Sequence, residues 1–423
     1  MLVNNKVQDK RHSDASGCSS QFRYAKIKHR RYFCLDQNPA VLAWVLFIRK
    51  ETLSPGFKLE SKEMLRWLRW LRWIYWWYRY NLNFFRTNFR ILIGFIYYKL
   101  QLRNIEPDLE LPFYGQLSML VHKGYKIFDL RRGVVRKVFN QGVDSATIMN
   151  EIERMKNVSQ IDFAPSISRW NIEERWYEED YISGSLESGK PLDSKNLLKK
   201  FYKYIVPGNT TLILYRKPMT RNSVDYVNEI IEILDASRLS RQGIDSKNIR
   251  KISNFTHSIV ERLQGYENCP CYLVFTHGDF CPENMLNTKH GLRIFDWESS
   301  EYRSALFDFY SYFFYRPVQH NLPVDKLVSE INEALPFFIS KLDLKVPDIA
   351  KSLLSFEKVY RWLYYIERVS MLVNRDITDT NLNTMNYILR YIEAFNSYEE
   401  VLAGQLPEKD NIGNTCLNLN QRY

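Results

Sequence analysis

The sequence predicts an α+β protein in which a small strand-rich part is followed by a mostly helical part, with a basic, aromatic extension ahead of both. Short apolar runs separated by Gly-containing turn signals fill residues 117–139, as expected for antiparallel strands. Beyond Pro191 the apolar spacing is mostly helical. With 423 residues and 45% hydrophobic content, the chain is long enough to bury a sizeable core.

The first hundred residues differ from the rest in charge. They hold 19 Lys/Arg and 6 Asp/Glu, a net charge of +13, whereas the remaining 323 residues carry a net charge of −2. Residues 1–63 are expected to form a basic, largely disordered tail and linker, because the first 35 are polar and Ser-rich. The first apolar run, 41–48, is too short to cross a bilayer, and no signal peptide is recognised.

An aromatic and arginine-rich segment follows at residues 64–105. It contains no acidic residue, eight Lys/Arg and five of the ten tryptophans. The spacing of Trp67, Trp70, Trp73 and Trp77 predicts an amphipathic helix with an arginine stripe on another face. Such a helix fits the headgroup layer of an anionic membrane. The alternatives are that its tryptophan face packs on the protein itself or contacts a partner. Nucleic acid is the unlikely partner, because no binding module surrounds the segment.

Cysteine usage indicates the cellular setting. The six cysteines form no CxxC pair and no ladder typical of disulfide-rich proteins. Reduced thiols in a cytoplasmic protein fit this usage. The expected localisation is therefore cytoplasmic, at the cytoplasmic face of a membrane if the aromatic helix binds lipid.

The parts of the chain are expected in a fixed order. Three antiparallel strands within residues 117–139 turn at Gly124 and Gly133, and a later strand ends near Gly184. The predicted parts are the tail and linker 1–63, the aromatic helix 64–105, a strand-rich lobe 106–184, a helical lobe 185–405 and a C-terminal tail 406–423.

The third strand and the helix after it carry charged residues that suit a binding site. Val135 and Lys137 share one face of the strand because side chains alternate. A helix over residues 145–158, with Ser145 as its N-cap, carries Glu151. Lys137 is either an edge residue of the strand or a buried lysine that reaches into a cleft.

Two short stretches of the helical part combine carboxylates and an amide at a distinctive spacing. They are "THGDFCPENML", residues 276–286, and "FDWES", which begins at Phe295. Asp279 is followed five residues later by Asn284 and, after twelve more, by Asp296. Mg²⁺ prefers oxygen ligands of this kind, and phosphoryl transfer depends on positioning and charge neutralisation. An Asp with an Asn five residues later is the order of base and metal ligand in kinase catalytic loops.

The stretch "HGDFCPEN" resembles the catalytic loop of the aminoglycoside phosphotransferase and choline kinase family. "DWE" (296–298) resembles the metal-binding segment of that family, and "ALFDF" (305–309) the Asp-containing stretch that follows it. The resemblance covers roughly residues 110–400. It implies a two-lobed protein-kinase-like fold, ATP and Mg²⁺ as cofactors, and transfer of a phosphoryl group to a hydroxyl acceptor.

The same resemblance implies a role for each matching residue. Asp279 would be the catalytic base, Asn284 and Asp296 the metal ligands, and His277 and Asp308 structural support. For ATP, the implied residues are Lys137 on the phosphates, Glu151 as its partner with Glu153 as competitor, Val135 over the adenine, and Asp180 and Ile182 in the hinge. No GxGxxG motif precedes Lys137, so the phosphate cover has no assigned residue.

Three hypotheses of function remain open at this point. The first is a kinase for a membrane-linked sugar or lipid headgroup that uses the aromatic helix as its membrane contact. The second is a soluble choline- or aminoglycoside-type kinase, and the third is a non-catalytic nucleotide-binding scaffold. Tyr312, Trp362 and Tyr365 form either an aromatic box for a quaternary ammonium or part of a helical core. A chain that begins at Asn104 is expected to keep the whole kinase-like fold.

Overall fold

The structure is a computed structural model of the 423-residue chain. It describes residues 21–28, 31–47, 89, 91–96, 98–100, 106–121, 123–186, 198–199, 201–202, 206–241, 243–266, 269–376 and 382–405. Trp67, Trp70, Trp73 and Trp77 lie outside the described residues, as does the tail 406–423. The interpretations of those segments therefore stay predictions.

The chain divides into two compact units, and the expected α+β class is confirmed in both. One unit, called the sheet unit below, comprises Met1–Pro55, Ser61–Ile152 and Ser166–Ile182. The other, called the helical unit, comprises Gly56–Glu60, Glu153–Pro165 and Ser183–Tyr423.

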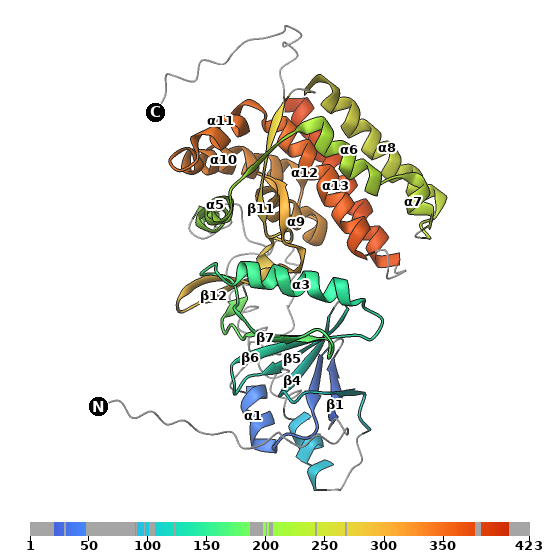
Figure 1. Cartoon of the computed structure of the whole chain (residues 1–423), viewed down its shortest axis with the longest axis vertical. Helices are drawn as coiled ribbons and strands as arrows, with labels where there is room; N and C mark the ends of the chain where they lie inside the picture. Colours follow the sequence, from blue (N-terminus) through green and yellow to red (C-terminus); the bar gives the residue numbers. More distant parts are fainter. Residues whose placement is uncertain are drawn as a thin grey trace, which may run out of the picture. The chain divides into compact units, whose positions relative to one another are not determined.

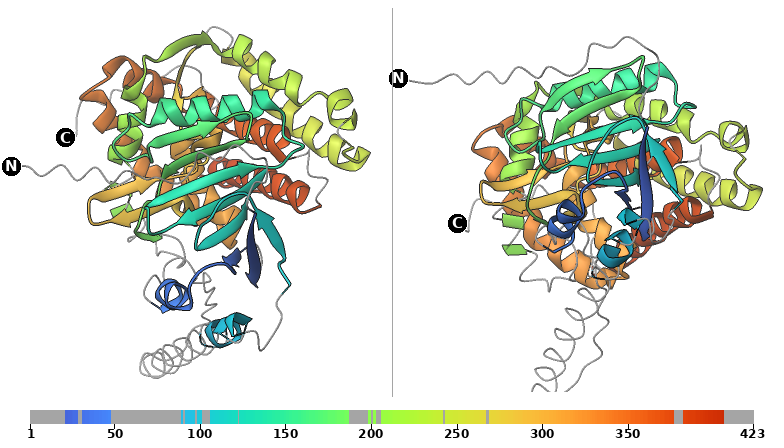
Figure 2. Two further views of the ribbon diagram at one scale, coloured as in Figure 1. Left: turned by 60° about the horizontal axis from the view of Figure 1, so that its bottom comes forward. Right: turned by 90° about the horizontal axis from the view of Figure 1, so that it is seen from below.

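The sheet unit is built on one curled antiparallel sheet in the strand order β3-β1-β2-β4-β5-β6-β8-β7 (Figure 2). Each neighbouring pair in this order is antiparallel. Its strands are β1 (Phe22–Lys28), β2 (Arg31–Cys34), β3 (Leu109–Leu111), β4 (Leu117–Val121), β5 (Gly124–Asp129), β6 (Val134–Phe139), β7 (Ile167–Asn171) and β8 (Trp176–Asp180).

Turns at Lys123 and Gly133 separate the three central strands, β4, β5 and β6. These strands confirm the prediction for residues 117–139. Lys123 and Gly133 have φ values of 65° and 70° at the turns, the left-handed conformation that tight hairpins require. A Cβ at Gly124 would lie 2.0 Å from the backbone oxygen of Val138. Strands β5 and β6 therefore approach more closely there than a side chain allows.

The strand expected to end near Gly184 is instead the hairpin β7–β8, and β8 ends at Asp180. The Asn171 side chain accepts the Glu174 N–H at 3.0 Å, and Arg175 has a φ of 65°. An Asx turn followed by a left-handed residue therefore reverses the chain.

Helix α3 (Ser145–Val158) has the bounds that the sequence predicted, but its N-terminal cap differs. The Asp144 carboxylate accepts the Thr147 N–H at 2.8 Å and the Thr147 hydroxyl at 2.6 Å. Asp144, and not Ser145, thus satisfies the first amides of the helix.

The expectation that residues 1–63 are largely disordered is wrong for residues 22–28 and 31–47, which contain β1, β2 and helix α1 (Pro39–Phe47). Tyr24 is fully buried, and its hydroxyl donates to the Phe113 oxygen at 3.0 Å. Tyr24 also pairs with Leu109 in the sheet. Partners more than eighty residues away stabilise this segment, and its own composition does not reveal them. A chain that begins at Asn104 would lose two strands of the sheet, so it is not expected to keep the fold.

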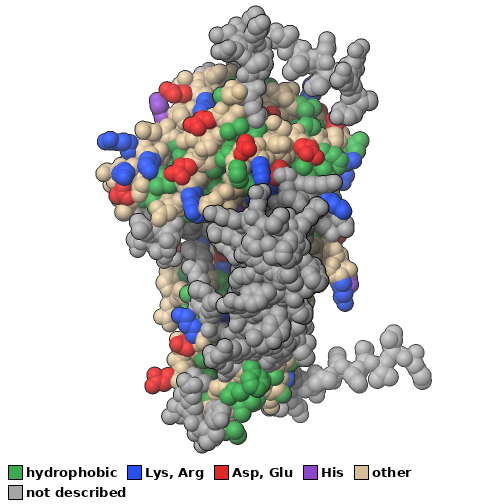
Figure 3. All heavy atoms as spheres, turned by 180° about the vertical axis from the view of Figure 1, so that it is seen from behind, with side chains coloured by type: hydrophobic (Ala, Val, Ile, Leu, Met, Phe, Trp, Pro, Cys, Tyr) green, Lys and Arg blue, Asp and Glu red, His purple; other side chains and the backbone are tan. Residues whose placement is uncertain are grey.

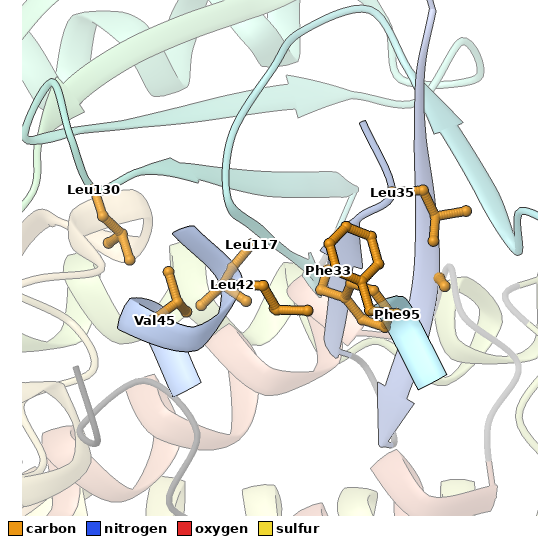
Figure 4. Packing of buried hydrophobic residues seen from close by; sticks show 8 residues of the cluster. Phe33, Leu35, Leu42, Val45, Phe95, Leu117 and Leu130 are labelled. Atoms are coloured by element: carbon orange, nitrogen blue, oxygen red, sulfur yellow. The ribbon is translucent and has the colours of Figure 1, made fainter. Parts of the chain in front are cut away.

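The described end of the aromatic helix packs on the sheet unit. Phe95 is fully buried in a cluster with Leu42, Val45 and Leu117, and its ring meets the Phe33 ring edge-on at 5.6 Å (Figure 4). This part of the helix therefore contacts the protein itself, as one of the two main interpretations of the segment proposed.

The helical unit combines two small sheets with a helical core (Figure 1). Its helices are α5 (Val206–Tyr215), α6 (Ser223–Ile233), α7 (Ala236–Arg241), α8 (Ser246–Leu263), α9 (Phe307–His320), α10 (Val324–Asp343), α11 (Pro347–Ser355), α12 (Glu357–Asp376) and α13 (Leu382–Gln405). The sheets have the orders β10-β11-β14 and β13-β12-β9. Their strands are β9 (Ser185–Leu186), β10 (Met219–Asn222), β11 (Pro270–Thr276), β12 (Met285–Thr288), β13 (Gly291–Ile294) and β14 (Glu301–Ser304), and the single-turn helices are η3 (Gln264–Tyr266), η4 (Pro282–Asn284) and η5 (Trp297–Ser299).

Charge and hydropathy of the described surface bear on possible partners. Basic and acidic side chains are interspersed over the helical unit on the face that Figure 3 shows. A mixed surface of this kind does not favour a polyanion such as nucleic acid. None of the helices within the described ranges has the length and apolar character needed to cross a membrane.

The packing of the described helix end can be tested by two phenylalanines. Phe95→Ala should lower the free energy of unfolding by about 3–5 kcal/mol, because it leaves a cavity in a buried cluster. Phe89→Ala, at a residue that is 57% exposed, is the matched control and should change it by less than about 0.5 kcal/mol. Urea unfolding followed by circular dichroism measures both, and equal effects would contradict the packing.

Candidate active site

A buried ion pair lies in the sheet unit at the residues that the resemblance marked for ATP. Lys137 Nζ lies 2.5 Å from Glu151 Oε1, and the two residues are 1% and 4% exposed. The Tyr177 hydroxyl donates to the same Glu151 oxygen at 3.1 Å. The structure therefore pairs Lys137 with Glu151 and leaves the competitor Glu153 exposed.

The face of the sheet that carries Lys137 holds a second lysine that sequence reasoning missed. Lys126 on β5 is the cross-strand partner of Lys137, and its Nζ lies 3.8 Å from Glu179 Oε1. Val135 is paired with Glu179 in the register of β6 and β8, so it shares this face as well. The alternation in "GYKIFD" was the only sequence signal for Lys126.

The predicted hinge already uses two of its backbone donors within the sheet unit. The Asp180 N–H donates to the Ser166 oxygen at 3.0 Å, and the Tyr181 N–H donates to the Gly133 oxygen at 2.8 Å. The donor to an adenine would therefore come from Ile182. The hinge roles of Asp180 and Ile182 stay predictions.

In the helical unit, the loop after β11 is held by a buried carboxylate. Asp308, in the first turn of α9, accepts the His277 N–H at 2.6 Å and the Gly278 N–H at 3.0 Å. Burial raises the pKa of Asp308, while His277 and the two amide hydrogen bonds act in the opposite direction. Asp308 is thus placed where the resemblance expected structural support.

The His277 ring connects the two stretches that the sequence singled out. Its Nδ1 accepts the Asp279 N–H at 3.2 Å, and its Nε2 lies 3.0 Å from the Phe295 oxygen. Both bonds form when Nε2 carries the proton. The ring is fully buried and packs on Trp297 with the ring centroids 4.5 Å apart. This arrangement fits a structural role for His277 rather than proton transfer.

Left-handed backbone conformations determine the course of the chain at Gly278, next to Asp279, and at Asp296. Gly278 has a φ of +84°, and a Cβ there would lie 2.2 Å from the Ser299 oxygen, so only glycine fits the loop. Asp296 has a φ of 69° although it carries a side chain. Such conformations are uncommon outside glycine and cluster at functional sites.

The spacing of Asn284 and Asp296 is explained by a hairpin. Strands β12 and β13 pair Met285 with Ile294, and the Phe295 N–H donates to the Asn284 oxygen at 3.1 Å. Asn284 and the residue before Asp296 therefore meet at one end of the hairpin. Although Asn284 and Asp296 are twelve residues apart in the sequence, the hairpin brings their backbone segments together.

Asn284 also holds Asp279. Its Nδ2 donates to Asp279 Oδ2 at 3.1 Å and to the Asp279 backbone oxygen at 2.9 Å. This orientation leaves Oδ1 of Asn284 as its candidate metal-binding atom. The structure thus brings Asp279 and Asn284 together directly, as the motif predicted.

The residues of this loop fit a magnesium ion that is bound together with a nucleotide. Within the described ranges, no group of three or more His, Cys, Asp or Glu side chains is arranged to hold a metal. Mg²⁺ usually takes one or two carboxylates and completes its octahedron with waters and substrate phosphates. One carboxylate from Asp296 and one amide oxygen from Asn284 suit that mode and would not suit an all-protein cage.

Arg368 on α12 is a site residue that the sequence did not indicate. Its Nη1 donates to the Gly278 oxygen at 3.0 Å, and its Nη2 lies 3.2 Å from Asp279 Oδ1. It follows Asp279 by 89 residues, within an apolar helical run that reads as core. No local motif could have linked the two.

The three aromatic residues considered as a box are core residues. Tyr365 stacks on Phe395 with the ring centroids 4.2 Å apart, and Trp362 packs against Tyr266 at 5.9 Å. All three residues are at most 8% exposed, and Tyr312 packs elsewhere, against Phe201. The helical-core alternative therefore describes them, and the box does not.

Comparison with known proteins gives likenesses to solved structures only. No family model and no curated protein matches the chain. A choline kinase from Streptococcus pneumoniae is 16% identical, with 67% of this chain and 93% of that chain covered at a TM-score of 0.42. A choline kinase from Cryptosporidium parvum is 16% identical, with 64% and 83% covered at a TM-score of 0.43. The ADP-bound aminoglycoside phosphotransferase APH(2'')-Ib is 13% identical, with 66% and 93% covered at a TM-score of 0.40.

These are the protein classes that the loop motif resembles. The sequence identities and TM-scores are too low to carry an argument about activity. The proposed activity rests on the geometry of the site instead.

The Lys137–Glu151 pair predicts strong coupling in a double-mutant cycle. Lys137→Met and Glu151→Gln should each destabilise the fold, since each leaves a buried charge without its partner. The double variant should lose less free energy of unfolding than the sum of the two single losses, by about 0.5–3 kcal/mol. The exposed Glu153 supplies the control, because Glu153→Gln should be additive with Lys137→Met. Chemical unfolding of the single and double variants measures this, and additivity at Glu151 would exclude the pair.

Proposed function

We propose that the chain is an ATP- and Mg²⁺-dependent phosphotransferase that transfers the γ-phosphoryl group to a hydroxyl of a small molecule. The observation that carries the proposal is the arrangement at Asp279. Its carboxylate is held by the Asn284 amide at 3.1 Å, and Asn284 is paired in turn with the segment that leads into Asp296. A base beside two oxygen ligands is what phosphoryl transfer from a metal–nucleotide complex needs.

In this proposal the residues of the helical unit perform the transfer. Asp279 accepts the proton of the acceptor hydroxyl as the bond from oxygen to the γ-phosphorus forms and ADP leaves. Asn284 and Asp296 hold Mg²⁺, which neutralises the charge of the phosphates when bound. His277 and Asp308 keep the loop in place through the hydrogen bonds to its backbone.

The residues of the sheet unit bind the nucleotide in the same proposal. Lys137 contacts the phosphates, and Glu151 orients the lysine from α3 at 2.5 Å. Val135 covers one face of the adenine, and Asp180 and Ile182 supply backbone groups to its edge. Removing a lysine and a glutamate from water costs desolvation free energy even when they are paired. Binding of the nucleotide phosphates would give this buried pair a function.

The alternative from outside the enzymes is a non-catalytic nucleotide-binding scaffold. Such a scaffold would need a nucleotide site but no catalytic base. The contact between the Asn284 amide and the Asp279 carboxylate serves no purpose in nucleotide binding alone, because it orients the base. Magnesium-dependent ATP turnover distinguishes the two hypotheses.

The proposed roles predict different effects for the base and a metal ligand. Asp279→Asn should lower ATP turnover by about 10²–10⁴-fold, the range for a positioned acid–base group, and leave Mg·ATP binding intact. Asp296→Ala should weaken Mg·ATP binding as well. Asp343→Asn, at an exposed position on α10, is the matched control and should change neither. Labelled ATP with choline, ethanolamine, aminoglycoside and lipid-linked saccharide acceptors measures turnover, and near-normal rates for Asp279→Asn would exclude the assignment.

A membrane-linked acceptor is supported by the exposed face of the described helix end. Phe89, Ile93, Ile96 and Leu100 are 57%, 37%, 37% and 63% exposed, and their spacing places them on one helical face. The surrounding segment 64–105 has eight Lys/Arg and no acidic residue. Apolar and basic side chains together suit the surface of an anionic bilayer. In this form the enzyme works at the cytoplasmic face of a membrane.

Vesicle binding tests the membrane contact. The full chain should sediment with phosphatidylserine-containing vesicles and less so at high salt, because the attraction is screened. Leu100→Glu should weaken binding about tenfold or more, since it removes the burial of one leucine. Leu344→Glu, at a residue 78% exposed in the helical unit, is the matched control. Equal vesicle binding by the two variants would contradict a membrane contact at Leu100.

A further inference from the structure

We propose that Arg368 is a positioning residue for the reaction, which holds the Asp279 carboxylate in the orientation that receives the proton of the acceptor hydroxyl. The inference rests on the proposed function, because it assigns a role relative to the base. It concerns a residue that lies outside the catalytic-loop motif and that the sequence assigned no role.

The contacts of the Arg368 guanidinium point to the loop of the base. Nη1 donates to the Gly278 oxygen at 3.0 Å, and Nη2 lies 3.2 Å from Asp279 Oδ1. One side chain thus holds both the backbone before the base and one of its carboxylate oxygens. The other oxygen, Oδ2, accepts from Asn284 Nδ2 at 3.1 Å. The two contacts together fix the rotation of the carboxylate about its bond to the chain.

The guanidinium is itself held from behind. Its Nη2 donates to the Tyr391 hydroxyl on α13 at 3.0 Å, and its central carbon lies 4.8 Å from the centroid of the Tyr391 ring. The Tyr391 hydroxyl lies 3.5 Å from that of Tyr387. Arg368 is 2% exposed, so its position is determined by packing as well as by hydrogen bonds.

The contacts of Asp279 must leave room for the acceptor hydroxyl. A carboxylate has about four lone-pair sites, so these contacts are compatible with one more hydrogen bond from the acceptor.

A purely structural role explains Arg368 less well. Its Nε–H is buried with no hydrogen-bond acceptor among the described residues, which is a cost that most buried donors avoid. Seven residues earlier on the same helix, Arg361 is also buried, at 5% exposure. It is paired with Glu357 and Glu399 at 2.8 Å each. Arg361 therefore shares the helix, the residue type and the burial of Arg368, but it is paired with glutamates that are not part of the loop.

The pair of arginines gives a matched experiment, with water as the acceptor hydroxyl and Mg·ATP as the only substrate. Attack of water forms its bond to the γ-phosphorus, breaks the bond to ADP and passes a proton to Asp279. Arg368→Met should lower kcat by about 10²-fold, the lower end of the range for a positioned acid–base group, and change KM for ATP by less than threefold. Arg368→Lys should restore part of the rate.

Arg361→Met should lower stability and leave the kcat of the folded enzyme unchanged. A milder variant, Tyr391→Phe, removes the hydroxyl that accepts from Arg368 and should give a smaller loss of kcat, which keeps the test usable if Arg368→Met fails to fold. Turnover that depends on Asp279 while the Arg368 and Tyr391 variants keep the native kcat would overturn the inference alone. Turnover that ignores Asp279→Asn would overturn the proposed function and the inference with it.

Discussion

The buried Asp308 carboxylate is the contact on which the proposed catalytic loop depends. It accepts two consecutive amide N–H groups, from His277 and Gly278, where the chain leaves β11. A buried donor left unsatisfied costs about 1–3 kcal/mol, so a path of the loop that left both amides buried without an acceptor would carry that penalty twice. With both amides fixed, Gly278 takes its left-handed conformation and Asp279 projects from a loop that cannot rotate.

Helix α12 extends this constraint to the small sheet from which the loop emerges. Glu367 accepts the Ser304 N–H at 2.7 Å and the Ser304 hydroxyl at 2.5 Å, so it holds β14, the neighbour of β11. Burial raises the pKa of Glu367 to about 6, against the effect of the hydrogen bonds from Ser304 and Tyr226. The next residue, Arg368, holds the loop itself. Two adjacent residues on one helix therefore fix both the strand that supports the base and the base.

Local patterns predicted the parts of this structure whose determinants are close in sequence. The three strands of residues 117–139, the bounds of α3 and the Asp279–Asn284 contact depend on turns, helical spacing or one loop. Parts determined by distant partners were missed. Strands β1 and β2 are stabilised by pairing with β3 and β4, and Arg368 meets Asp279 across 89 residues. Composition placed these strands in a largely disordered tail and linker, because the partners that stabilise them lie elsewhere in the chain.

The packing of α1 and of Phe95 in one cluster has a topological consequence for the segment between them. The chain leaves this cluster after α1 and returns to it with the helix that carries Phe95, so anything bound between these two points stays tethered to the unit that carries Lys137. A single proteolytic cut between Phe47 and Phe89 would divide the chain without releasing the N-terminal fragment, since β1 and β2 remain paired in the sheet.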